Sequence, residues 1–187
     1  MIAAMEDVLV RTREDFERLP EDGHWEVVEG RAILLPGNDI PHQKVSVAFL
    51  QAFLRELKAL GRGHVYPTVN VFVPPPPGFR LGKVQNRVPD LVVSIHEPAK
   101  AFEVGDPPEL VIEILSTRRG NVDRTEKLDD YARAGIQEYW IVNPFDRAVE
   151  VYLLRDGDYA LARTVSQGTL APQAFPALGI QLDEIWQ

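Results

Sequence analysis

A glutamate inside an apolar segment is the first feature of this sequence with a chemical consequence. The segment "LVIEIL" (110–115) has the composition of a core strand, yet Glu113 lies in its middle. A carboxylate that is buried without a partner is costly unless it takes up a proton. A second acid, Asp90, opens the preceding apolar strand directly after Pro89. Neighbouring strands lie about 4.8 Å apart, so the two carboxylates can point at one spot if these strands pair.

A divalent cation is the simplest way to hold two carboxylates together. Close carboxylates repel each other, and one of them takes up a proton unless a cation lies between them. Mg²⁺ binds one or two carboxylates, keeps several waters and takes substrate phosphate oxygens for the rest. The sequence has no cysteine and no histidines at the HExxH spacing, which makes zinc less attractive. The pattern therefore favours a metal site at Asp90 and Glu113.

A lysine on the following helix could add positive charge to this site. Lys127 and Tyr131 are four residues apart, so they share one face at the edge of the helix's apolar stripe. If the helix packs near the Glu113 face of the strand, the ammonium group can reach the carboxylates. There it could orient a metal-bound water and stabilise developing negative charge.

Each of these residues also has an ordinary interpretation. An aspartate after proline is often a turn residue, a glutamate in an apolar strand often faces solvent at a sheet edge, and a helical lysine is usually solvated. The occurrence of Asp90, Glu113 and Lys127 together weakens these alternatives. On the residues alone, the hypothesis is a candidate metal site and nothing more specific.

The elements that position these residues follow from periodicity and turn residues. The strongest prediction is a helix over 41–60, with Asn38 or Asp39 as its cap and Gly61 as its end. A strand, a helix over 123–134 and a second strand form a crossover, so strands 110–115 and 138–142 are predicted to be parallel. The remaining predictions are a helix over 12–19 capped by Thr12 with Asp15, hairpins turning at Glu29-Gly30 and Asp156-Gly157, and strands over 64–73 and 87–95.

Together these elements predict an α/β fold in one domain over residues 1–187. Its core is a mixed β-sheet flanked by helices, with extra β-hairpins at the N-terminal and C-terminal ends. A chain of 187 residues is long enough to bury a sizeable core. The absence of cysteine, of a signal peptide and of a long apolar run leads us to expect a cytoplasmic protein that does not enter a membrane.

The net charge of −8 argues against non-specific binding to nucleic acid, which usually needs a basic protein. Two segments beside the candidate site are nevertheless rich in basic residues, and they could contact phosphates. The alternative is that these are solvated loop charges. The basic residues are Arg80, Lys83 and Arg87 in the first segment and Arg118, Arg119 and Arg124 in the second.

Three segments, "VPDLVV", "PPELVIEILS" and "DRTEKLDDYARAGIQEYWIVNP", resemble the Uma-two family. This is a large bacterial family of restriction-endonuclease-like proteins in the PD-(D/E)XK nuclease superfamily. The similarity is ordered over residues 89–144 and extends upstream through "WEVVEGRAILLPG" and "PHQKVSVAFL". The resemblance implies a restriction-endonuclease-like fold and hydrolysis of phosphodiester bonds in DNA with Mg²⁺ or Mn²⁺.

The resemblance also implies roles for single residues. Asp90 and Glu113 match the two acidic motif positions and would hold the metal, but position 115, where the motif lysine is expected, is Leu115. The lysine of this family lies on the following helix, where Lys127 stands, and it would help to position the attacking water. Accessory roles are implied for His42, for the acids Glu26 and Glu29, and for Tyr131, which we expect to pack rather than to act.

Three hypotheses remain open at the level of sequence. The first is a metal-dependent endonuclease, which the complete set of Asp90, Glu113 and Lys127 favours. The second is a catalytically weak nuclease-fold module with a binding or regulatory role, and the third is a nuclease-fold subunit that needs a partner protein to reach DNA. The net charge of −8 favours the latter two. The apolar C-terminal segment or the hairpins could form a homodimer face.

Overall fold

The main sheet has six strands in the order β10-β9-β8-β7-β6-β3. The computed structural model describes residues 8–37, 39–79, 82, 84–116 and 124–187. β7 and β8 are parallel, and every other neighbouring pair of this sheet is antiparallel, which confirms the predicted mixed α/β fold. The strands are β3 (His64–Pro67), β6 (Leu91–Ser94), β7 (Leu110–Ile114), β8 (Glu138–Asn143), β9 (Ala148–Arg155) and β10 (Asp158–Val165).

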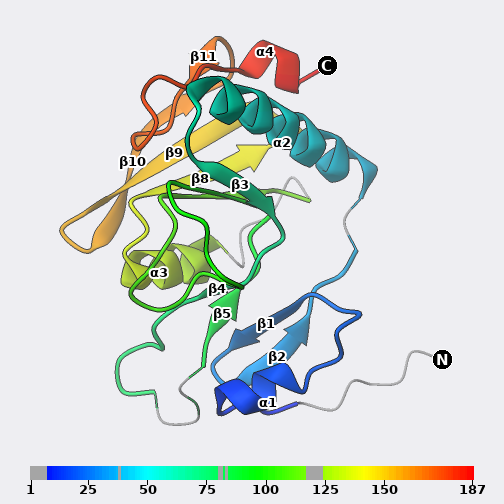
Figure 1. The fold of residues 1–187 in the computed structure, drawn as a ribbon, viewed down its shortest axis with the longest axis vertical. Helices are drawn as coiled ribbons and strands as arrows, with labels where there is room; N and C mark the ends of the chain where they lie inside the picture. The colour runs from blue at the N-terminus through cyan, green and yellow to red at the C-terminus, as the bar shows by residue number, and fades with distance from the viewer. Residues whose placement is uncertain (1–7, 38, 80–81, 83, 117–123) are drawn as a thin grey trace.

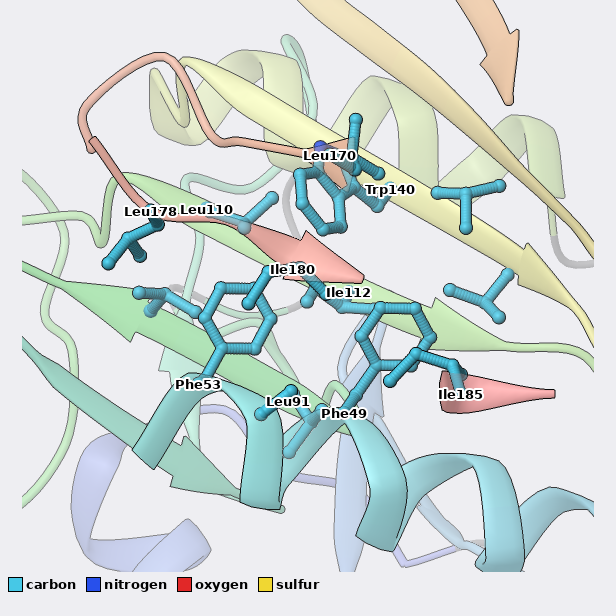
Figure 2. Close-up of a cluster of buried hydrophobic side chains, with 14 of the residues drawn as sticks. Phe49, Phe53, Leu91, Leu110, Ile112, Trp140, Leu170, Leu178, Ile180 and Ile185 are labelled. Carbon is cyan, nitrogen blue, oxygen red and sulfur yellow. The ribbon is translucent and has the colours of Figure 1, made fainter. Parts of the chain in front are cut away.

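Helix α2 (Ile40–Leu60) covers one face of this sheet (Figure 1). Asp39 caps the helix by accepting a hydrogen bond from the His42 backbone N–H at 2.9 Å, and Gly61 ends it with a positive φ of 72°. Its apolar stripe packs on alternate residues of the central strands, with Phe49 and Phe53 against Trp140 (Figure 2). Three short C-terminal elements complete this layer, namely β11 (Thr169–Leu170), β12 (Ile180–Gln181) and α4 (Leu182–Ile185).

Helix α3 (Arg124–Ala134) covers the opposite face and connects the two parallel strands (Figure 1). Val92 and Val111 pack on this side against Tyr131, whereas their sequence neighbours face α2. The helix is followed by Gly135 with a φ of 80°, as predicted for its C-terminal end. The predicted cap, Asp123, lies outside the described residues.

A second sheet of four strands, in the order β2-β1-β5-β4, is formed by the N-terminal hairpin and two short later strands. Glu29 and Gly30, with φ of 48° and 73°, form the predicted turn of the hairpin. Helix α1 (Arg13–Glu17) has the predicted capping box of Thr12 and Asp15, but it ends before residue 19. The strands are β1 (Trp25–Val28), β2 (Arg31–Leu34), β4 (Val71–Phe72) and β5 (Asn86–Arg87).

Two segments predicted as single strands in fact pass from one sheet to the other. The prediction of a strand over 64–73 is wrong, because Thr68 has a φ of 47° and the bend there separates β3 from β4. The predicted strand 87–95 is likewise divided, with Arg87 in the four-stranded sheet and Leu91 in the six-stranded sheet. Asp90 lies at this second crossing, so it stands where the two sheets meet.

The C-terminal hairpin of β9 and β10 turns at Asp156 and Gly157 as predicted, with φ of 54° and 93°. A bulge between Leu161 and Arg163 interrupts the pairing of the edge strand β10. Among the helices of the described residues, none combines the length and the apolar character that crossing a membrane requires.

Candidate active site

The two acidic residues predicted to meet are placed on paired strands. β6 and β7 are antiparallel with Leu91 opposite Ile112, so the same register continued by one residue sets Asp90 opposite Glu113. Asp90 Oδ2 accepts a hydrogen bond from the Ile114 backbone N–H at 2.7 Å, just beyond the last paired residues of the ladder. This bond fixes the Asp90 side chain against β7.

Glu113 is held by two residues of α3. Lys127 Nζ donates to Glu113 Oε1 at 3.0 Å, and the Tyr131 hydroxyl donates to the same oxygen at 2.7 Å. The side chains of Lys127 and Glu113 are only 11% and 13% exposed, which confirms that this lysine faces inward. Tyr131 both packs in the core and donates a hydrogen bond, so the expectation that it only packs was incomplete.

His42 joins the site from the first turn of α2. Its Nε2 lies 3.1 Å from Asp90 Oδ1, and its ring is buried. Burial disfavours the charged imidazolium, but the hydrogen bond and charge of Asp90, with further help from Asp39 and Glu113, outweigh it and raise the pKa of His42. Both oxygens of Asp90 are therefore oriented, one by His42 and one by β7.

The surroundings of Glu113 disfavour its ionised form. Burial, with added contributions from the charges of Asp90 and Glu26, raises the pKa of Glu113 to about 7, although Lys127 and the Tyr131 hydrogen bond act in the opposite direction. Burial, followed by the nearby charge of Glu113, raises the pKa of Tyr131 well above its ordinary value. Tyr131 thus stays neutral and acts as a hydrogen-bond donor.

A third buried carboxylate, Glu26 on β1, approaches the same lysine. Glu26 Oε1 lies 3.5 Å from Lys127 Nζ and accepts a hydrogen bond from the Val88 backbone N–H at 3.1 Å. Glu26 Oε2 accepts from Arg87 Nη1 at 3.0 Å. The resemblance had indicated Glu26 as one of two accessory acids. The other one, Glu29, is exposed in the hairpin turn, and no described contact joins it to the site.

The structure corrects the assignment of Arg87 to an exposed basic segment. Its side chain is only 2% exposed, and it pairs with Glu26 of β1 and with Asp130 of α3. These partners are 61 and 43 residues away in sequence, so no local pattern could have identified them. Of the other predicted DNA-contacting residues, Arg80, Lys83, Arg118 and Arg119 lie outside the described residues, and Arg124 begins α3.

The chemistry of the site fits a hard divalent cation such as Mg²⁺ or Mn²⁺. Both described hydrogen bonds of Glu113 end on Oε1, so Oε2 has no hydrogen-bond partner among the residues that the structure describes. Asp90 would contribute further carboxylate oxygens, and a cation would offset the repulsion that Asp90 and Glu26 exert on Glu113. Within the same residues, no group of three or more His, Asp or Glu side chains is arranged to hold a metal. Water and substrate oxygens would therefore have to complete the coordination.

Comparisons with known proteins agree with this architecture. Curated proteins give no match. A solved structure described as a putative nuclease belonging to DUF820, from Anabaena variabilis, superimposes with a TM-score of 0.70 at 19% sequence identity. The match covers 92% of this chain and 96% of the other, so the two proteins share a fold. The family model of Uma2, described as "putative restriction endonuclease", matches residues 13–183, and the chain therefore belongs to the Uma2 family.

Proposed function

We propose that this protein is a metal-dependent endonuclease that hydrolyses phosphodiester bonds in DNA at the site of Asp90, Glu113 and Lys127. The observation that supports this most directly is the 3.0 Å contact between Lys127 Nζ and Glu113 Oε1. It places an ammonium group beside the acidic pair, although the sequence has Leu115 where the motif lysine is expected. Membership of the Uma2 family supports the same reaction class.

Asp90 and Glu113 would hold one or two Mg²⁺ or Mn²⁺ ions, most directly through Glu113 Oε2 and the oriented carboxylate of Asp90. When bound, such an ion lowers the pKa of a water molecule and stabilises charge on the scissile phosphate. Lys127 would orient the attacking water and add positive charge next to the phosphate. Tyr131 and His42 would keep the two carboxylates in place, since each contacts one of them.

The approach of DNA would depend on local basic residues, because the whole chain has a net charge of −8. The basic residues proposed to contact phosphates are those other than Arg87, because Arg87 is buried. They are Arg80, Lys83, Arg118, Arg119 and Arg124. With few phosphate contacts and an acidic remainder, binding to DNA is expected to be weak and to fall with rising salt.

The test is a nicking assay on supercoiled plasmid and on branched DNA with Mn²⁺ or Mg²⁺. We expect cleavage by the wild type and loss of at least about 100-fold in rate for Asp90→Asn, because this change removes a proposed metal ligand. Lys58→Met, on the exposed side of α2, is the control for a lost surface charge. Equal nicking by wild type and Asp90→Asn would disprove this site. DNA binding without cleavage would identify a nuclease-fold binding module instead.

A further inference from the structure

We propose that Arg87 is a positioning residue that keeps Lys127 on Glu113 by neutralising the competing carboxylate of Glu26. This inference rests on the proposed role of Lys127. Arg87 is too deeply buried to touch DNA in this conformation, and it lies on β5, outside the six-stranded sheet that contains Glu113. Its influence on the reaction would therefore be exerted through other side chains.

The guanidinium group of Arg87 connects the four-stranded sheet to α3. Nη1 donates to Glu26 Oε2 at 3.0 Å, and Nε donates to Asp130 Oδ2 at 2.6 Å. Asp130 lies three residues after Lys127 on α3, and Glu126, the residue before Lys127, lies 3.7 Å from Nη2. The planar guanidinium group of arginine can donate hydrogen bonds to two carboxylates at fixed angles, which the ammonium group of lysine cannot do.

Glu26 and Glu113 compete for the ammonium group of Lys127. Its Nζ lies 3.0 Å from Glu113 Oε1 but 3.5 Å from Glu26 Oε1. Both carboxylates are buried or nearly so, and a buried carboxylate without a cation is strongly destabilising. Glu26 is satisfied by Arg87 and by the Val88 N–H, so the closer ammonium contact can go to Glu113. Without the Arg87 charge, Glu26 would draw Lys127 away from the carboxylate that binds the metal.

A purely structural role is the main alternative, because Arg87 also holds α3 through Asp130. That carboxylate is buried, and it accepts further hydrogen bonds from Gln85 at 2.7 Å and from Arg133. These other donors keep Asp130 partnered when Arg87 is changed. The loss of Arg87 would therefore have its largest effect on Glu26, which accepts no second side-chain hydrogen bond among the described residues.

The deciding experiment compares Arg87→Met with the double variant Glu26→Gln/Arg87→Met. A shift of about 1 Å in a catalytic group costs on the order of 100-fold, so Arg87→Met is expected to lower kcat about 100-fold with KM nearly unchanged. The double variant is expected to recover at least about 10-fold of this loss, because the competing carboxylate has become a neutral amide. A purely structural role predicts no recovery of kcat, because Asp130 still lacks its hydrogen bond from Arg87 in the double variant. A double variant no more active than Arg87→Met would overturn the proposal.

Two further measurements keep the result interpretable. Crystal structures of the variants should show Lys127 Nζ closer to Glu26 than to Glu113 in Arg87→Met, and the original order in the double variant. This readout tests the positioning even if the wild type fails to cleave DNA, which would count against the proposed function alone. If Arg87→Met does not fold, Arg87→Gln replaces it, because it removes the charge but keeps a side-chain hydrogen-bond donor. The double variant that combines this change with Glu26→Gln is expected to be more active than the single Arg87 variant. Equal or lower activity of the double variant would overturn the proposal.

The matched control is the surface pair of Arg55 and Glu184. Arg55 Nη2 donates to Glu184 Oε2 at 3.2 Å, and the Arg55 side chain is 54% exposed on α2. Arg55→Met and Glu184→Gln/Arg55→Met change the same residue types and the same total charge as the test variants. Both are expected to cleave within about twofold of wild type, because exposed ion pairs contribute little.

Discussion

Two neighbouring strands of the main sheet each have a glutamate in an apolar segment, and the two are satisfied in different ways. Glu138 on β8 is buried, and each of its oxygens accepts one hydrogen bond from an uncharged donor. Oε1 accepts from Trp140 Nε1 at 2.7 Å, and Oε2 accepts from the Gln173 N–H at 2.6 Å. Glu113 on β7 accepts both of its described hydrogen bonds on Oε1, and one of the two donors is an ammonium group.

The difference separates a structural carboxylate from a candidate catalytic one. Glu138 ties the C-terminal segment to β8, and burial raises its pKa while these two N–H donors lower it. Glu113 has two other acids nearby, Asp90 and Glu26. Its Oε2 has no hydrogen-bond partner among the described residues. Burial of a carboxylate is thus not sufficient to mark a site. The informative features are a cationic partner and an unpaired oxygen beside a second acid.

The largest expected effect is on cleavage. Glu113→Gln is expected to lower kcat by at least about 1,000-fold, because a neutral amide is a poor ligand for a divalent metal. Glu138→Gln is expected to keep cleavage within about fivefold of wild type, since its contacts lie on the other face of the sheet. Both variants are measured in the plasmid assay at matched metal concentration. Similar losses in the two variants would abolish the distinction between the two glutamates.

The next effect concerns the ammonium group of Lys127, which donates a hydrogen bond to Glu113. Lys127→Met keeps most of the side-chain length and removes the charge, and a decrease of about 100-fold in kcat is expected, the usual size for a group that assists proton transfer or charge stabilisation. The pKa of Glu113 should rise further, because Lys127 is the strongest of the contacts that lower it. A pH–rate profile of the variant measures both kcat and the pKa of Glu113. An unchanged rate would show that Lys127 only offsets buried charge.

These contrasts also show what the sequence could predict. The strand and helix periods are local features, and so are the cap at Asp39 and the end at Gly61 of α2. They predicted that Lys127 could reach Glu113 from α3, but we expected Tyr131 to pack and not to donate a hydrogen bond to Glu113. The positive φ at Thr68 that divides a predicted strand is a single-residue choice without a pattern.

The burial of Arg87 depends on partners brought together only by the packing of two sheets. The same is true of the contact between Glu26 and Lys127, which joins β1 to α3. Charged residues in such positions look like surface residues in the sequence, because their neighbours give no sign of the distant partner. The resemblance to a family indicated Glu26 where residue patterns did not, but it gave no indication of Arg87.

The pH dependence of stability separates the two glutamates without any substrate. Glu113 has a pKa of about 7 in the folded protein against an ordinary value of 4.5, so the folded state binds more protons than the unfolded state between these values. Without metal, its contribution lowers stability as pH rises from 4.5 to about 7, by on the order of 3 kcal/mol. Glu113→Gln should remove this decrease, and Mg²⁺ at pH 8 should stabilise the wild type but not the variant. Thermal unfolding across pH measures both; a Mg²⁺ effect that persists in Glu113→Gln would contradict the assignment.

At neutral pH, Glu138→Gln should have the opposite effect on stability from Glu113→Gln. Glu138→Gln replaces one acceptor oxygen by an NH₂ group that faces an N–H donor, from Trp140 or from Gln173. A buried donor left unsatisfied costs about 1–3 kcal/mol, so the free energy of unfolding should fall by this amount. Glu113→Gln, which removes a repelled charge, should lose less or gain at pH 8. Chemical denaturation of both variants gives the comparison.

The smallest expected effect is at Tyr131, where packing and hydrogen bonding can be separated. Tyr131→Phe keeps the ring in contact with Tyr139 and removes only the hydroxyl that donates to Glu113 at 2.7 Å. The loss of one such bond is expected to cost about 1–2 kcal/mol in stability at pH 8, where Glu113 is ionised, and less below pH 6, where it is protonated. Because Lys127 still holds Glu113, cleavage should fall by only about 3–10-fold. A pH-independent loss of stability would show that the hydroxyl serves packing alone, and that Glu113 is oriented by the lysine without help from the tyrosine.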